Sequence, residues 1–266
     1  MTKTRNPLIR TTAALWAAAA SCALIVPGAR AGLADFEALQ SANTNLVFQY
    51  KFEGADDSTR LADGSANAFS LQRAAGSGAY TTGDIQFLPG FDGTSQAYQP
   101  AYDPADRLNG AGLITSSAGV PLSSNVTVEA VVQFGNYAGS AATTYVLCGR
   151  PASGRAYFWR QSAGPVISST FGSNNSDQPT VLSYVPGDWY YIALTATYDS
   201  GTGTTTVNWY GADLSASETT LQHYGMFDYS FSGDWTGTTS IGVGVFNNGT
   251  QEYMDGRLDN TALTGG

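Results

Sequence analysis

The feature that most constrains this chain is a repeated alternation of apolar and polar residues in short segments. In residues 45–53 every second side chain is apolar: Leu46, Phe48, Tyr50 and Phe52. Residues 126–134 alternate in the same way. Side chains two residues apart lie on the same face of a β-strand, so each segment has one face suited to a core. Half-buried strands are therefore the expected building units.

Further segments of this kind follow, separated by clusters of Gly, Ser, Asn, Asp and Pro. We predict strands at residues 143–148, 155–161, 166–171, 180–185, 189–198, 204–210, 240–246 and 252–259. Residues 126–134 and 189–198 are almost continuously apolar, which indicates central strands. Many short strands without intervening helices are typical of sandwiches and barrels. The sequence therefore predicts an all-β fold, an antiparallel β-sandwich of two sheets.

The first 31 residues have the organisation of an export signal. A basic start precedes the apolar residues 11–26, and Ala29 and Ala31 are the small residues of a cleavage site. A membrane anchor is the alternative, but the apolar run is shorter than the roughly 20 residues that span a bilayer. We expect cleavage after Ala31 and a secreted, extracellular or cell-surface protein. The mature chain is expected to have no membrane span.

Residues 32–45 are expected to form a short leader ahead of one large domain, residues 46–266. Within the leader, Leu33, Phe36 and Leu39 recur at intervals of three, which predicts a helix over residues 32–42.

The charge balance excludes several classes of function. The chain of 266 residues has 12 Lys and Arg against 21 Asp and Glu, a net charge of −9. Removal of the export signal takes away four basic residues and no acidic one, which leaves −13. Nucleic acid is not an expected partner, because affinity for its backbone depends on Lys and Arg. Cys22 leaves with the signal, so Cys148 has no partner for an intrachain disulfide and no cysteine cluster can hold zinc.

Several motifs in order resemble laminin-G-like jelly-roll domains of the concanavalin A-like lectin/glucanase superfamily. In the central motif Trp189 opens a long strand, and after a turn a second strand carries Trp209 shortly before a glycine. In the closing motif a glycine precedes an aliphatic-Asp pair, Leu258 and Asp259. The matching segments are residues 50–54, 63–64, 91–93, 187–194, 198–199, 207–211, 241–242 and 253–260. The resemblance implies that residues 46–266 form a concanavalin A-like jelly roll.

The sequence predicts a protein without catalytic activity. Superfamily members that cleave glycans carry a Glu-x-Asp-x-(x)-Glu strand, and no such run is present. A carboxylate pair assembled across strands, such as Glu129 with Asp259, is left open. His223 lies in a stretch without a strand pattern and is interpreted as an exposed loop residue. Cys148 stands at a strand end and is interpreted as a small buried apolar residue.

The resemblance also implies a structural calcium ion where the opening and closing strands meet. Glu53 and Asp259 are the residues that would carry it here. Calcium prefers hard oxygen ligands from carboxylates and backbone carbonyls, which suits an exported acidic protein. The alternative is that these are two solvated acids at strand ends.

Binding of a glycan would use aromatic faces on sugar rings and amides on hydroxyls. The ligand-binding candidates are Trp159, Trp235, Asn174 and Asn247, although both tryptophans could equally fill the sandwich edges. The leading hypothesis is an exported, non-catalytic lectin-like module that binds carbohydrate or a cell-surface protein, with a structural calcium ion. The alternatives are a structural or adhesive cell-envelope protein, and an atypical glycoside hydrolase or polysaccharide lyase.

Overall fold

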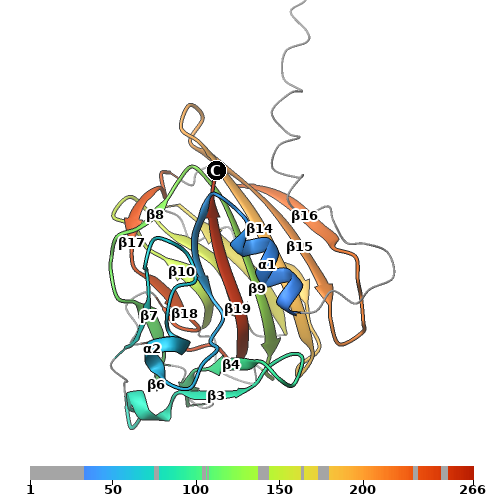
Figure 1. Cartoon of the computed structure of the whole chain (residues 1–266). Coiled ribbons are helices and arrows are strands. Elements are labelled where there is room, and N and C mark those ends of the chain that lie inside the picture. Colours follow the sequence, from blue (N-terminus) through green and yellow to red (C-terminus); the bar gives the residue numbers. More distant parts are fainter. Residues whose placement is uncertain are drawn as a thin grey trace, which may run out of the picture.

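The structure is a computed structural model that describes residues 33–266, apart from 75–77, 104–105, 107, 137–143, 163–164, 173–179, 230–232 and 247–250. Two large antiparallel sheets pack face to face and form a β-sandwich, which confirms the predicted fold class (Figure 1). The predicted export signal lies outside the described residues. Within them, no helix combines the length and the apolar character needed to cross a membrane.

The first sheet, called sheet A, has at its centre the two strands with the most apolar sequences. In the described residues its order is β16-β15-β14-β9-β19-β4-β3, and β1 pairs with β19. The bounds are β16 (Gln222–Tyr229), β15 (Thr204–Asp213), β14 (Trp189–Asp199), β9 (Asn125–Phe134), β19 (Gly256–Gly265), β4 (Gln96–Gln99), β3 (Gln86–Pro89) and β1 (Leu46–Tyr50).

The second sheet, called sheet B, closes the sandwich on the other side of the core. Its order in the described residues is β13-β12-β11-β10-β18-β7-β2. The bounds are β13 (Thr180–Ser183), β12 (Val166–Phe171), β11 (Ala156–Ser162), β10 (Thr144–Gly149), β18 (Ile241–Val243), β7 (Leu113–Thr115) and β2 (Leu71–Arg73). Two short pairs join β17 (Gly237–Thr239) to β8 (Val120–Leu122) and β5 (Ala101–Tyr102) to β6 (Gly110–Ala111).

The core lies between the sheets and is built from the alternating apolar residues. Phe48, Tyr50 and Phe52 are fully buried there, as the alternation in the opening segment predicts. Cys148 is buried outside this core, in a small separate cluster with Tyr145, Tyr157 and Phe246. Burial of apolar surface is the dominant favourable contribution to folding, so these side chains hold the two sheets together.

Short helices flank the sheets. The leader forms α1 (Leu33–Ser41), as predicted, and it lies across the outer face of sheet A (Figure 1). A second helix, α2 (Asp57–Arg60), begins with a capping box between Asp56 and Thr59, and a 3-10 turn covers Thr82–Asp84. Because α1 covers only part of the sheet, it divides the outer face of sheet A into a covered part and an open part.

Several strands differ from the sequence-based expectation. Strands β2 to β8 and β17 were not predicted. Residues 222–229 form β16, although no strand pattern was recognised there, so His223 lies on a strand and not in a loop. The last strand, β19, begins at Gly256 and continues to Gly265, past its predicted end at Asp259. Asp259 lies at a register shift in the pairing of β19 with β9, between Leu258 and Asn260.

Candidate functional site

The two tryptophans predicted to contact a ligand lie inside the sandwich. Trp159 is 2% exposed and Trp235 is fully buried, and both belong to the central core. The indole N–H of Trp235 donates a hydrogen bond to the Thr205 hydroxyl over 2.8 Å. Neither ring face is open to a sugar. The alternative interpretation, in which both tryptophans fill the interior of the sandwich, therefore fits the structure better. Asn174 and Asn247 lie outside the described residues.

Substitution of Trp235 by phenylalanine is expected to lower the free energy of unfolding by about 1–3 kcal/mol, because it removes a buried hydrogen bond and leaves a small void. Urea denaturation followed by circular dichroism measures the change. Affinity for saccharides is expected to stay the same in the folded variant. If the variant has unchanged stability but no longer binds saccharides, Trp235 contacts the ligand and this interpretation is wrong.

Glu53 and Asp259 lie in one cluster of carboxylates at the β3–β4 end of sheet A. The cluster, which also contains Asp92, is called the acidic cluster. Glu53 Oε1 accepts the backbone N–H of Gln96 at 2.7 Å, and Asp259 Oδ2 accepts the neighbouring Ser95 hydroxyl at 2.9 Å. The opening segment, the β3–β4 turn and β19 therefore meet at this point, where the resemblance places the metal.

The carboxyl groups of the acidic cluster differ in electrostatic environment. Burial, together with the smaller effect of the charges of Glu53 and Asp92, raises the pKa of Asp259 to about 7. The pKa of Glu53 is also raised, mainly by burial. The backbone N–H of Ser95 holds the pKa of the more exposed Asp92 at about 2. Asp259 Oδ1 is buried without a hydrogen-bond partner. A buried carboxylate oxygen without a partner is unfavourable, and protonation or a bound cation would remove this cost.

The donor set meets only part of what a metal ion requires. Calcium takes six to eight oxygen ligands, of which carboxylates are usually several. Among the residues that the structure describes, no group of three or more His, Cys, Asp or Glu side chains is arranged to hold a metal ion. Glu53 and Asp259 would therefore need backbone carbonyls or water to complete a coordination shell.

A second candidate site lies on the outer face of sheet A and follows from the strand register. One row of directly paired residues crosses six strands and is called the Glu129 row: Gln49, Ala262, Glu129, Ala193, Tyr210 and His223. Paired residues of antiparallel strands share a face, so these side chains line up. Neighbouring strands are about 4.8 Å apart, which places Tyr210 about 10 Å and His223 about 14 Å from Glu129.

Glu129 is a partly buried carboxyl with an altered proton affinity. Its Oε1 accepts a short hydrogen bond from the Tyr191 hydroxyl, and its carboxyl group is also hydrogen-bonded by the Gln40 side chain. Burial raises its pKa, and the two hydrogen bonds lower it in part. Ala193 and Ala262, its neighbours in the row, are both buried, so the carboxyl group is surrounded by packed side chains.

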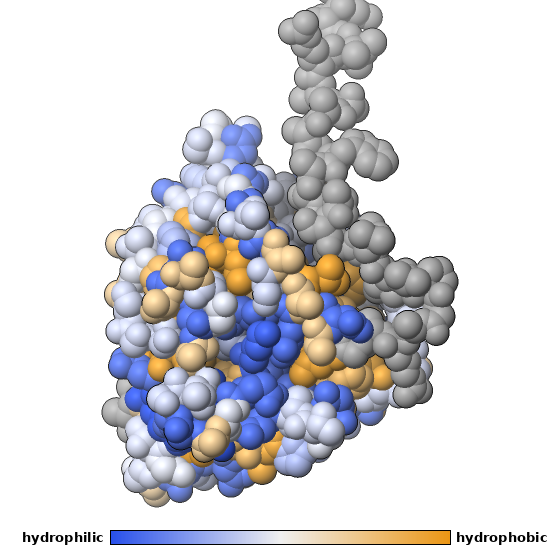
Figure 2. Space-filling model, in the orientation of Figure 1, coloured by the Kyte–Doolittle hydropathy of each residue, from blue (hydrophilic) through white to orange (hydrophobic). Residues whose placement is uncertain are grey.

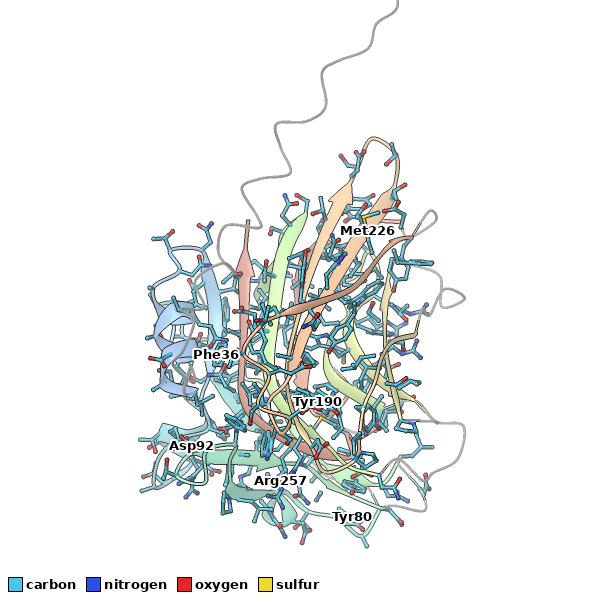
Figure 3. The ribbon with its side chains drawn as sticks, turned by 90° about the vertical axis from the view of Figure 1, so that its right-hand side faces the viewer. Phe36, Tyr80, Asp92, Tyr190, Met226 and Arg257 are labelled. Atoms are coloured by element: carbon cyan, nitrogen blue, oxygen red, sulfur yellow. The ribbon has the colours of Figure 1, made fainter. Side chains whose placement is uncertain are left out.

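The open part of the face carries hydroxyl, amide and aromatic groups. The rings of Tyr210 and His223 lie 5.0 Å apart, and His223 Nε2 is 3.3 Å from Asn208 Oδ1. The next row consists of Thr264, Thr127, Thr195, Asn208 and Met226. Met226 is 60% exposed, on the side away from Phe36 of α1 (Figure 3).

The covered part of the face lies under α1. Phe36 stacks on Tyr191, with ring centroids 4.8 Å apart and planes 17° from parallel. Leu33 and Phe36 pack with Trp189 and Val131 in an apolar cluster outside the main core. Figure 2 shows hydrophilic surface in the middle of the face that carries α1, bordered by more apolar patches.

The sequence named Glu129 only as one half of a pair with Asp259. In the structure the two carboxyl groups have different neighbours: Glu129 contacts Tyr191 and Gln40, whereas Asp259 contacts Phe91 and Ser95. The importance of Tyr210 and His223 was missed. The strand register could have identified Tyr210, because β9 and β14 pair Glu129 with Ala193, and β14 and β15 pair Ala193 with Tyr210.

No protein-family model and no curated protein sequence matches the chain. Solved structures do. A marine PL-14 alginate lyase from Aplysia kurodai is similar with a TM-score of 0.49 at 10% identity, over 82% of this chain and 97% of that one. An endo-1,3-beta-glucanase from Streptomyces sioyaensis is similar with a TM-score of 0.46 at 14% identity, over 84% of this chain and 98% of that one. A Trypanosoma rangeli sialidase is similar with a TM-score of 0.46 at 11% identity, over 84% of this chain but only 31% of the sialidase.

The concanavalin A-like and laminin-G-like resemblances therefore both rest on the sequence motifs, whereas the two-sheet sandwich follows from the strand pairing itself. This comparison corrects the prediction of a protein without catalytic activity. The alginate lyase, the glucanase and the sialidase named above are all enzymes that act on glycans. Identities this low transfer no activity, so the function of this chain is argued from its own site.

Proposed function

We propose that the protein acts on a neutral glycan held against the outer face of sheet A, with Glu129 as the group that transfers a proton. The observation that carries the proposal is the Glu129 row. It places a carboxyl group of raised pKa on the same strand-crossing line as the paired rings of Tyr210 and His223. A proton-transfer group and an aromatic platform are thus aligned on one face.

The chemistry of this face suits sugar hydroxyls. Threonine hydroxyls and the Asn208 amide exchange hydrogen bonds with hydroxyl groups, and the faces of aromatic rings pack on the apolar faces of sugars. The two rows contain no lysine or arginine, and the whole chain is acidic. A polyanionic glycan would meet repulsion without a compensating cation, so the charge of the site favours a neutral glycan.

Glu129 has the properties that proton transfer requires. A general acid or base works best when its pKa lies near the working pH, and burial is the usual way to raise a carboxyl group toward that range. The hydrogen bond from Tyr191 holds the carboxyl group in one orientation. When protonated, Glu129 is suited to donate a proton to a leaving oxygen, and when ionised it is suited to accept one.

Removal of the ring of Tyr210 in Tyr210→Ala is expected to weaken glycan binding about fivefold, because an aromatic contact contributes about 1 kcal/mol. Isothermal titration calorimetry with a neutral oligosaccharide measures the change. Tyr80→Ala is the matched control, since Tyr80 lies at the opposite end of the molecule from Met226 of β16 (Figure 3). Equal affinity in both variants would contradict this site.

We also propose that the acidic cluster binds a structural calcium ion through Glu53 and Asp259. The buried Asp259 Oδ1 without a partner supports this proposal, because a cation at that position would satisfy it. A bound cation would also offset the mutual repulsion of Glu53, Asp92 and Asp259. The ion would stabilise the junction of the opening and closing segments and take no part in the reaction.

A further inference from the structure

We infer that the surface under α1 is a sugar-binding subsite next to Glu129, and that the glycan takes the place of α1 on it. The inference rests on the proposed function and adds where the sugar beside Glu129 is held. Because α1 covers this surface in the free protein, binding of the glycan and displacement of the helix are one event.

While α1 is in place, the open part of the face does not extend to Glu129. Tyr210 is partly exposed, but Ala193, which separates it from Glu129 in the row, is only 1% exposed. Ala193 belongs to the same apolar cluster as Leu33 and Phe36 of α1. A carboxyl group that exchanges a proton with a glycan has to be in contact with it, so the proposed role of Glu129 requires α1 to move.

The surface under α1 is polar, whereas a helix usually packs its apolar side against a sheet. Gln49 and Asn260 are both fully buried there. The side-chain nitrogen of Gln49 donates to Gln40 Oε1 at 2.9 Å and to the Glu37 carbonyl at 3.1 Å. Its oxygen accepts the Ser41 hydroxyl at 2.8 Å. Displacement of α1 would free this amide to bind sugar hydroxyls, which need both donors and acceptors.

The contact of α1 with this surface leaves one polar group unsatisfied. Asn260 Nδ2 donates to Glu37 Oε1 over 3.5 Å, and Asn260 Oδ1 is buried without a hydrogen-bond partner among the described residues. A buried acceptor without a partner costs free energy, and a sugar hydroxyl that donates to it would recover this cost. The helix therefore satisfies the surface less completely than a sugar would.

The groups that α1 places on the surface resemble those of a sugar. The Phe36 ring stacks on Tyr191 with planes 17° from parallel, where the apolar face of a sugar ring would pack. The Gln40 amide is hydrogen-bonded to the Glu129 carboxyl group, where a sugar oxygen would lie during proton transfer. Phe36 and Gln40 are four residues apart and project from the same side of the helix, so one displacement frees both positions.

The test follows α1 while a glycan binds to the full chain. A helix of nine residues is not stable alone in water, so a displaced α1 unfolds and its amide hydrogens exchange faster. Neutral gluco-, manno- and xylo-oligosaccharides are screened by calorimetry, and the tightest binder is used. At saturation we expect faster hydrogen exchange in residues 37–43 and slower exchange in β14 and β15.

The affinity of a variant with a loosened helix gives a second measurement. A cover lowers the apparent affinity by the fraction of molecules that are open. Phe36→Ala removes the stack on Tyr191, so we expect it to bind the oligosaccharide about fivefold more tightly. Leu39→Ala is the matched control and should bind as the wild type does, because Leu39 is 56% exposed on the same helix. Thermal melts establish that both variants are folded.

Two results overturn the subsite and leave the proposed function standing. One is slower exchange in β14 and β15 with exchange in residues 37–43 unchanged or slower. The other is a folded Phe36→Ala variant that binds no more tightly than the wild type. If none of the oligosaccharides binds, the proposed function itself is wrong, and the subsite with it.

Discussion

Replacement of Glu129 by glutamine is expected to lower the turnover of the glycan substrate by about 100- to 10,000-fold, the usual contribution of a general acid or base. Glutamine has nearly the same shape and keeps an oxygen for the Tyr191 hydroxyl, so the site geometry should persist while proton exchange is lost. Affinity for the glycan is therefore expected to change little. Initial rates on a panel of neutral polysaccharides, with calorimetric binding to the best one, measure both quantities.

Glu218→Gln is the matched control for this substitution. Glu218 is an exposed glutamate outside the two rows, and its Oε2 accepts the backbone N–H of Asp213 at 2.8 Å. Its replacement should leave turnover at the wild-type level. If folded Glu129→Gln retains full turnover, the proton is transferred by another group and the assigned role of Glu129 is wrong.

Without calcium, the folded protein is expected to lose stability as pH rises from 5 to 8, because of Asp259. Folding raises the pKa of this carboxyl group from 3.8 to about 7, so the folded chain holds the proton more tightly than the unfolded chain. The resulting stabilisation is complete below 3.8 and is lost as pH rises through about 7. It amounts to about 2–3 kcal/mol between pH 5 and pH 8, measurable by urea denaturation at each pH.

The same experiment with calcium separates a proton from a metal ion at the acidic cluster. Millimolar calcium is expected to restore the stability at pH 8 of the wild type but not of Asp259→Asn, which should also lack the slope with pH. Asp199→Asn is the control for the slope, because this exposed carboxyl group lies outside the acidic cluster and the backbone N–H of Gly201 lowers its pKa, so that it stays ionised throughout this range. Wild-type stability at pH 8 that does not respond to calcium would contradict the calcium proposal.

The sandwich could be predicted because its strong signals are local. The alternation in residues 126–134 follows directly from a strand with one face in the core, and β9 occupies Asn125–Phe134. Residues 189–198 are apolar on both sides because Tyr190 packs inward while Tyr191 packs under α1, and β14 occupies Trp189–Asp199. Burial determines which residues of a strand are apolar, so these strands can be predicted from a single sequence.

The candidate site could not be predicted because it depends on register between strands distant in sequence. Glu129, Tyr210 and His223 form a line only when β9, β14, β15 and β16 pair as they do. The strand that carries His223 was missed because Gly225 interrupts it with a φ of 142°, near a register shift at Trp209 and Tyr210. Glycine in a strand weakens the pattern that identifies it.

The tryptophan candidates show a related limit. Proximity to a turn in the sequence indicated exposure, but Trp235 enters the core beside Phe171, with ring centroids 5.2 Å apart. A large aromatic side chain buries enough apolar surface to draw a short loop inward. The side on which such a ring lies is decided by the packing of the whole sandwich.

Amide hydrogen exchange with and without a bound neutral oligosaccharide tests the central claim most directly, because it locates the ligand on one of two sheets. Protection is expected in β14, β15 and β16 and in the part of β9 around Glu129, with sheet B unchanged. Saccharide-dependent protection confined to sheet B, with no change in residues 204–213 and 222–229, would contradict the assignment of the glycan to the outer face of sheet A.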